Sequence, residues 1–87
     1  MGNRLNLDSA QKFSENLIKT AEIMETETEN INSGFKYLGD TFRDQNYNEF
    51  AGEINLASSS INKVIEDIRS LNRSFVEYVR QMGDLLR

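Results

Sequence analysis

The sequence predicts an all-α protein, an antiparallel two-helix hairpin that is expected to dimerise into a four-helix bundle. The first observation is the scarcity of helix-breaking residues. The 87 residues include no Pro and only five Gly, so most of the chain is expected to be helical. The second is periodicity, since apolar residues recur at helical spacing over most of the chain. The third is a single interruption at Gly39-Asp40-Thr41. We therefore expect one helical-hairpin domain over residues 1–87.

The first helix is expected at about residues 9–37. Asp8 can accept hydrogen bonds from the free backbone N–H groups of the first turn, and Gln11 follows three residues later, as in a capping box. Apolar residues then recur at helical spacing: Ala10, Phe13, Leu17, Ala21, Met24, Ile31, Phe35 and Leu38. Gly39 is expected to end this helix in the left-handed conformation that glycine adopts without strain.

The second helix is expected at about residues 41–86, capped by Asp40 or Thr41, with Asp44 near its positive end. Its apolar residues follow an unbroken 3,4 alternation: Tyr47, Phe50, Ile54, Ala57, Ile61, Val64, Ile68, Leu71, Phe75, Tyr78, Met82 and Leu85. A heptad seam of this length must be covered by other helices, because a lone helix cannot hide it from water.

The hairpin is expected to be unequal in length. A link of two or three residues makes the helices antiparallel, and pairing outward from the turn places residue 8 opposite about residue 69. The second helix would then extend past the first by roughly 17 residues, about 25 Å. Unless residues 1–8 extend the first helix, a second subunit must cover this apolar end. The predicted interface comprises Phe50, Ile54, Ile61, Ile68, Leu71, Phe75, Val76, Tyr78, Val79, Met82, Leu85 and Leu86.

Composition argues against several classes of function. The net charge of −4 disfavours nucleic acid, and no run approaches the roughly 18 apolar residues of a membrane-inserted helix. With no His, no Cys and no glycine-rich loop, we predict no catalytic, cofactor-binding or metal-binding residues and no enzyme. The acidic residues Glu22, Glu25, Glu27 and Glu29 form either a solvated helix face or a surface that steers a basic partner.

Tyr37-Leu38-Gly39 stands between the two expected helices, with the aromatic Phe42 three residues after Gly39. This segment resembles the Trp-X-Gly motif of the WXG family of type VII (ESX) secretion substrates and partners, with Tyr37 in place of Trp. The four-helix bundle expected of the dimer is what this resemblance implies. In that motif an aromatic side chain clamps the end of the hairpin and glycine supplies the turn. The family's C-terminal export signal, Tyr-X-X-X-Asp/Glu, is absent, because Met82 stands four residues after Tyr78.

The resemblance implies a small helical protein that acts by dimerisation, as a secretion substrate or as the carrier of one. Its partner would be a second copy or another helical hairpin, with a secretion ATPase or a toxin as further partners. It would be cytoplasmic before export and secreted without a cleavable signal peptide, since the first eight residues contain no apolar core of that kind. Two alternatives remain open: a self-assembling filament or scaffold subunit, and an adaptor or chaperone that holds an amphipathic helix.

Overall fold

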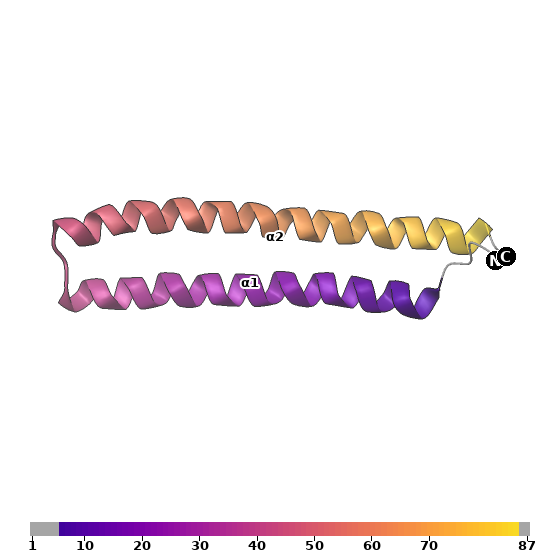
Figure 1. Ribbon diagram of the computed structural model, residues 1–87, viewed down its shortest axis with the longest axis horizontal. Helices are drawn as coiled ribbons and strands as arrows, with labels where there is room; N and C mark the ends of the chain where they lie inside the picture. Colours follow the sequence, from indigo (N-terminus) through magenta and orange to yellow (C-terminus); the bar gives the residue numbers. More distant parts are fainter. Residues whose placement is uncertain (1–5, 86–87) are drawn as a thin grey trace.

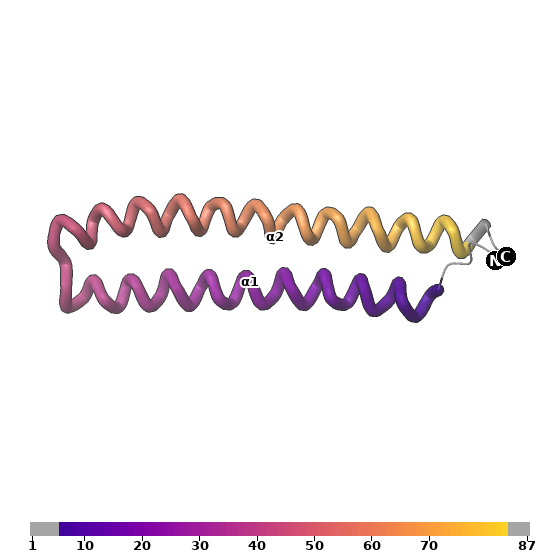
Figure 2. Tube along the Cα trace, viewed as in Figure 1, coloured from indigo at the N-terminus to yellow at the C-terminus, as the bar shows by residue number. Residues whose placement is uncertain are grey.

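The computed structural model describes residues 6–85, with side chains as far as residue 83. Two long helices lie side by side in opposite directions, α1 over Leu7–Thr41 and α2 over Gln45–Leu85 (Figure 1). One short turn joins them, as the tube in Figure 2 shows, and the molecule is a rod with extents of 64 × 20 × 17 Å. The predicted all-α hairpin is confirmed at this level, and the helix bounds differ from those predicted.

Helix α1 begins two residues earlier than predicted, because Asn6 and not Asp8 is its N-cap. The side-chain oxygen of Asn6 accepts a hydrogen bond of 3.0 Å from the backbone N–H of Ser9, which satisfies one free donor of the first turn. Asp8 lies inside that turn, where its negative charge interacts favourably with the positive end of the helix dipole. Gln11 donates to Glu15 and does not reach back to the cap.

The end of α1 lies four residues beyond the predicted one. The helix continues through Gly39 to Thr41, and no glycine in the described residues has a positive φ. Phe42 is the C-cap, and its backbone N–H donates to the carbonyl of Leu38 at 2.9 Å. The prediction that Gly39 ends the helix in a left-handed conformation is therefore wrong.

Gly39 is required for space. An added Cβ there would lie 2.5 Å from Cζ of Tyr47, which is closer than real side chains approach. The Tyr47 ring is only 9% exposed, stacks on Phe35 with 4.3 Å between ring centroids, and donates its hydroxyl to the Phe35 carbonyl at 3.1 Å. This cluster fastens the start of α2 to the last turns of α1.

The start of α2 also differs from the prediction. The link between the helices is three residues long, 42–44, within the predicted two or three, but it lies further along the chain. The carboxylate of Asp44 accepts a hydrogen bond of 2.9 Å from the backbone N–H of Tyr47. Asp44 therefore caps α2, in place of Asp40 or Thr41, which belong to α1.

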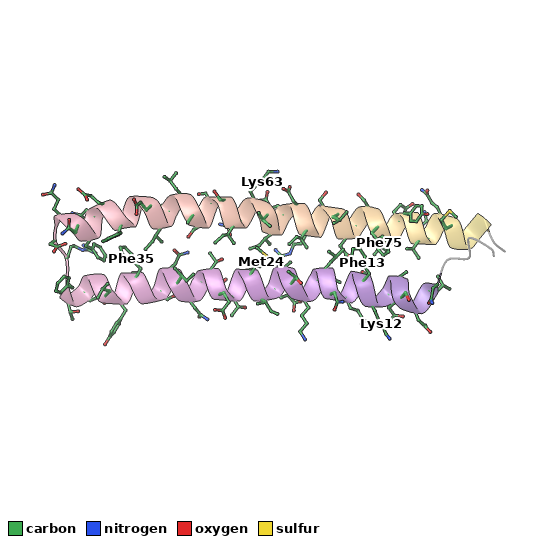
Figure 3. All side chains as sticks on the ribbon, viewed as in Figure 1. Lys12, Phe13, Met24, Phe35, Lys63 and Phe75 are labelled. Atoms are coloured by element: carbon green, nitrogen blue, oxygen red, sulfur yellow. The ribbon has the colours of Figure 1, made fainter. Side chains whose placement is uncertain are left out.

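The two helices are nearly matched in length, with 35 residues in α1 and 41 in α2. Near the open end, the ring of Phe13 packs edge-on against Phe75, with 4.9 Å between centroids (Figure 3). Leu7 lines one surface pocket together with Val76 and Val79. The predicted overhang of roughly 17 residues is wrong, because α1 continues past its predicted end and every pairing shifts towards the C-terminus of α2.

The core between the helices is thin. No large side chain in the described residues is fully buried, and the most buried ones are small or isolated, namely Ala10, Ala21, Thr28, Tyr47 and Ile65. The buried hydroxyl of Thr28 donates a hydrogen bond of 2.7 Å to the carbonyl of Met24. A pair of helices has no third element to close over this contact, so much of its apolar surface stays in water.

Candidate interaction surface

Helix α2 carries more apolar positions than α1 covers. The residues of α2 in contact with α1 are buried or half-buried and recur every three or four positions: Tyr47, Ala51, Ile54, Ser58, Ile61, Ile65, Ile68, Asn72, Phe75, Val79 and Met82. A second stripe, each member one residue earlier than a contact residue, is exposed: Phe50, Ala57, Val64, Leu71 and Tyr78. A spacing of seven keeps these five residues along one side of the helix.

The predicted seam is therefore divided between two environments. Its members Tyr47, Ile54, Ile61, Ile68, Phe75 and Met82 lie in the contact with α1, and the alternating members between them do not. Of the other residues predicted for the interface, Val79 is half-buried in the contact and Val76 is exposed. Leu86 and the side chain of Leu85 lie outside the described residues.

Helix α1 shows the same division. Its buried and half-buried positions are Ala10, Ser14, Leu17, Ala21, Met24, Thr28, Phe35 and Gly39. Beside them lie the exposed side chains of Phe13, Ile31 and Leu38. Phe13 and Ile31 are 18 residues apart, which is five full turns, and Leu38 follows seven residues later. The three therefore share one side of α1.

The exposed apolar residues of the two helices open on the same side of the hairpin. At the turn, Leu38 and Phe42 line one surface pocket together with Phe50 of α2. The two chains run in opposite directions. Residues one position before a contact residue, on either helix, therefore flank the contact between the helices on the same side. We call this surface the apolar face; its members are Phe13, Ile31, Leu38, Phe42, Phe50, Ala57, Val64, Leu71 and Tyr78.

The opposite side of the hairpin carries the polar contacts between the helices, although Leu7, Ile18 and Val76 are also exposed there. Hydrogen bonds between side chains of the two helices lie there: Ser14 to Asn72 at 2.6 Å, Ser58 to Asn32 at 3.1 Å and Arg69 to Glu25 at 3.2 Å. We call this side the polar edge. Its ion pair is exposed and contributes little stability, about 0–1 kcal/mol. The hydrogen bonds between the helices therefore lie on one side of the hairpin, and most of the exposed aromatic residues lie on the other.

The residues of the predicted turn motif lie in three different environments. Tyr37 is 75% exposed and points away from the contact between the helices. Gly39 is buried against Tyr47, and Phe42 is exposed at the C-cap. The aromatic clamp expected of the motif is thus supplied by Tyr47, with Phe35 beneath it.

Charge effects in the hairpin are confined to its surface. The hydrogen bond to Asp67 at 2.9 Å raises the pKa of Lys63, whose side chain points away from α1 (Figure 3). The hydrogen bond from Arg80 lowers the pKa of Glu77. Both pairs link neighbouring turns of α2 and are exposed, so each adds a small stabilisation to the helix.

The part of the chain that the structure describes was compared with the requirements of a metal site, a membrane-spanning helix and a ligand pocket. There, no group of three or more His, Cys, Asp or Glu residues is placed to hold a metal ion. Within the same residues, neither helix is apolar enough over a sufficient length to cross a membrane. The surface pockets are shallow openings between the helices, and the feature that stands out is the apolar face.

Comparison of the chain with protein families, with characterised proteins and with solved structures finds no match. The resemblance to the WXG family therefore rests on the turn segment and on the hairpin alone. Any function must be argued from the surface that this chain itself presents.

Five members of the apolar face were absent from the predicted site, namely Phe13, Ile31, Leu38, Ala57 and Val64. The sequence does contain a signal for them. Each helix carries two adjacent stripes of apolar residues, and a single neighbouring helix can bury only about one of the two stripes. The predicted seam lay on α2 alone, and the apolar residues of α1 were all expected in the contact within the hairpin. The exposed half of α1 was missed for that reason.

Proposed function

We propose that the chain is a non-enzymatic, WXG-like helical subunit that works through helix–helix association, as a substrate or carrier of a type VII secretion system. The observation that carries the proposal is the apolar face, which extends over both helices and is left exposed by the hairpin. Contiguous apolar patches of this kind mark association surfaces, because soluble chains rarely leave them in water.

The export role is supported by the turn. Tyr37-Leu38-Gly39 stands at the end of α1, and the Tyr37 side chain is accessible to another protein. Exposed aromatic side chains are favoured at protein contacts because they bury much area at little cost in conformational entropy. The partner that binds the Tyr37 side chain would be a secretion ATPase or an adjoining carrier protein.

The test is export by a host that carries a type VII system. The chain should accumulate in the medium of cells with an intact secretion ATPase and be lost from the medium when that ATPase is deleted. Tyr37→Ala should reduce export without changing the melting temperature, while Leu56→Ala, at a position 72% exposed elsewhere on α2, should leave export unchanged. A chain that stays in the cells, or leaves them without the ATPase, would contradict the proposal.

A second candidate is a self-assembling filament subunit. It is favoured by apolar pockets at both ends of the rod, one around Phe42 and Phe50 at the turn and one around Leu7 and Val79 at the open end. End-to-end contacts of unlike surfaces can continue without limit. Electron microscopy of the purified chain distinguishes the two, since the filament hypothesis requires long assemblies and the first proposal requires particles of limited size.

A further inference from the structure

We propose that the polar edge carries, beside the turn, a binding site for an extended acidic segment of a partner protein. A groove of about 470 Å³ opens there between the last turns of α1 and the first turns of α2. We call it the turn groove; its polar lining residues are Asn32, Lys36, Arg43, Asn48 and Asn55. It lies across the hairpin from the apolar face, so the inference is independent of the proposed export role and of any association through that face.

The turn groove is cationic, although the chain as a whole has a net charge of −4. Lys36 and Arg43 line it, and no Asp or Glu residue is among its lining residues. Among the described side chains neither cation forms an ion pair, although Asp40 stands four residues after Lys36. The carboxylate of Asp44 is already occupied as the cap of α2. Two cations without an acidic partner are suited to bind carboxylates, with which they form the stronger, charge-assisted hydrogen bonds.

The three asparagines provide groups that suit a peptide backbone. The side-chain oxygen of Asn32 accepts a hydrogen bond of 3.1 Å from Ser58, which leaves its amide nitrogen free to donate. The side chains of Asn48 and Asn55 are exposed and have no hydrogen-bond partner in the part of the chain that the structure describes. A carboxamide both donates and accepts, so it can bind the N–H and C=O groups of an extended chain. The two lie seven residues apart on α2, about 10 Å, a length that about three residues of extended chain span.

The floor of the turn groove is apolar and held in place by the hairpin. The Tyr47 ring is only 9% exposed and stacks on Phe35. The Arg43 guanidinium lies over the same ring, 5.4 Å from its centroid, and the half-buried side chains of Ala51 and Ile54 complete the floor. Because these residues are already ordered, a bound segment would pay mainly for ordering itself and the exposed amides.

Other occupants suit this lining less well. Lys36 and Arg43 repel a basic segment. An apolar partner would remove the three asparagine amides from water without replacing their hydrogen bonds. A helix already satisfies its own backbone groups, so it offers those amides fewer partners than an extended chain does. An extended segment with carboxylate side chains satisfies both the cations and the amides.

The test is an NMR titration of the full, isotope-labelled chain with a short synthetic peptide of alternating Glu and Ser. A peptide of the same length with alternating Lys and Ser is the control. The acidic peptide should shift the side-chain amide signals of Asn48 and Asn55 in a saturable manner, and the basic peptide should leave them in place. Added salt should weaken the binding of the acidic peptide, because the ion pairs that it forms are exposed to solvent.

Two variants assign the contacts. Lys36→Gln should raise the dissociation constant of the acidic peptide about two- to fivefold, the effect of one exposed ion pair. Asn55→Ala, which leaves the charge unchanged, should raise it by a similar factor because a hydrogen bond to the peptide is lost. Lys12→Gln is the matched control; it makes the same change of charge on a side chain of α1 that points away from α2 (Figure 3), and it should leave the dissociation constant unchanged.

Far-UV circular dichroism checks that each variant remains helical, as expected for exposed positions. The inference is overturned if the acidic peptide causes no saturable shift, or if the basic peptide causes the same shift. It is also overturned if Lys36→Gln and Asn55→Ala both bind as the native chain does. Inorganic phosphate that reproduces the shifts with the same affinity would likewise overturn it, because the site would then bind a simple anion and not a peptide.

Discussion

Two glycines of this hairpin are expected to respond to alanine in opposite directions. Gly39 and Gly52 both lie inside helices and neither has a positive φ, so alanine fits the backbone at each. Replacing a helical glycine with alanine stabilises by about 0.8–1.0 kcal/mol when nothing else changes. At Gly52 no atom lies within 4 Å of the added Cβ, so Gly52→Ala should be stabilising by about that amount.

At Gly39 the added methyl group would collide with Tyr47. Its Cβ would lie 2.5 Å from Cζ of the ring, which must then move off Phe35 and release the hydrogen bond to the Phe35 carbonyl. Overpacking costs about 1–3 kcal/mol and the lost hydrogen bond about 0.5–1.5 kcal/mol, against a gain of about 1 kcal/mol from helix propensity. Gly39→Ala should therefore be destabilising by about 1–3 kcal/mol.

Thermal unfolding followed by circular dichroism at one protein concentration separates the two variants. Each kcal/mol moves the melting temperature of a domain of this size by about 4–8 °C, so the variants should differ by at least about 8 °C. In a Tyr47→Ala background the clash is absent, and Gly39→Ala should then become stabilising like Gly52→Ala. The reasoning is refuted if both single variants shift the melting temperature the same way, or if the Tyr47→Ala background leaves the penalty in place.

Two further predictions concern the helix ends and the surface charges. Asp44→Ala should lower the free energy of unfolding by about 0.5–2 kcal/mol, because it removes the N-cap of α2. Asp40→Ala removes a negative charge from the negative end of α1, so it should leave the free energy of unfolding unchanged or slightly raised. An equal loss of free energy of unfolding in the two variants would contradict the capping role of Asp44. The lowered pKa of Glu77 means that its pairing with Arg80 stabilises the fold above the ordinary pKa of glutamate and is lost as the pH falls through the lowered value. In an NMR titration, Arg80→Gln should move the Glu77 midpoint upwards, and an unchanged midpoint would contradict the pairing.

The sequence was sufficient to predict the two helices, their antiparallel arrangement and the length of the link. Each of these depends on local signals, namely the absence of Pro, the helical spacing of apolar residues and the polar residues around residue 40. The position of the turn was misplaced because Gly39 has two uses that local sequence does not separate. It can end a helix, or it can make room for a ring eight residues away, and here the ring of Tyr47 decides.

The side on which the helices meet was also beyond the local pattern. A stripe of large apolar residues on α2 predicted the contact, and yet Ser58 and Asn72 face α1 while Val64 and Leu71 remain in water. Polar residues are acceptable in the contact because each finds a partner on α1. Such pairing joins residues that are distant in sequence, so periodicity on one helix cannot reveal it.

The central claim is that helix–helix association covers the apolar face, and the first partner to test is a second copy of the chain. The most direct measurement is the distance between spin labels by double electron–electron resonance, which is simplified because the chain contains no Cys. One label replaces Val64 on the apolar face, and a matched label replaces Asn62, which shares its side of α2 with Arg69 of the polar edge seven residues later.

Packed helix axes lie about 8–10 Å apart, so labels at Val64→Cys should be separated by less than about 25 Å. Labels at Asn62→Cys should be about 20 Å further apart, because two helix diameters lie between them. The account is contradicted if neither label gives a dipolar coupling, or if the labels at position 62 lie closer together than those at position 64.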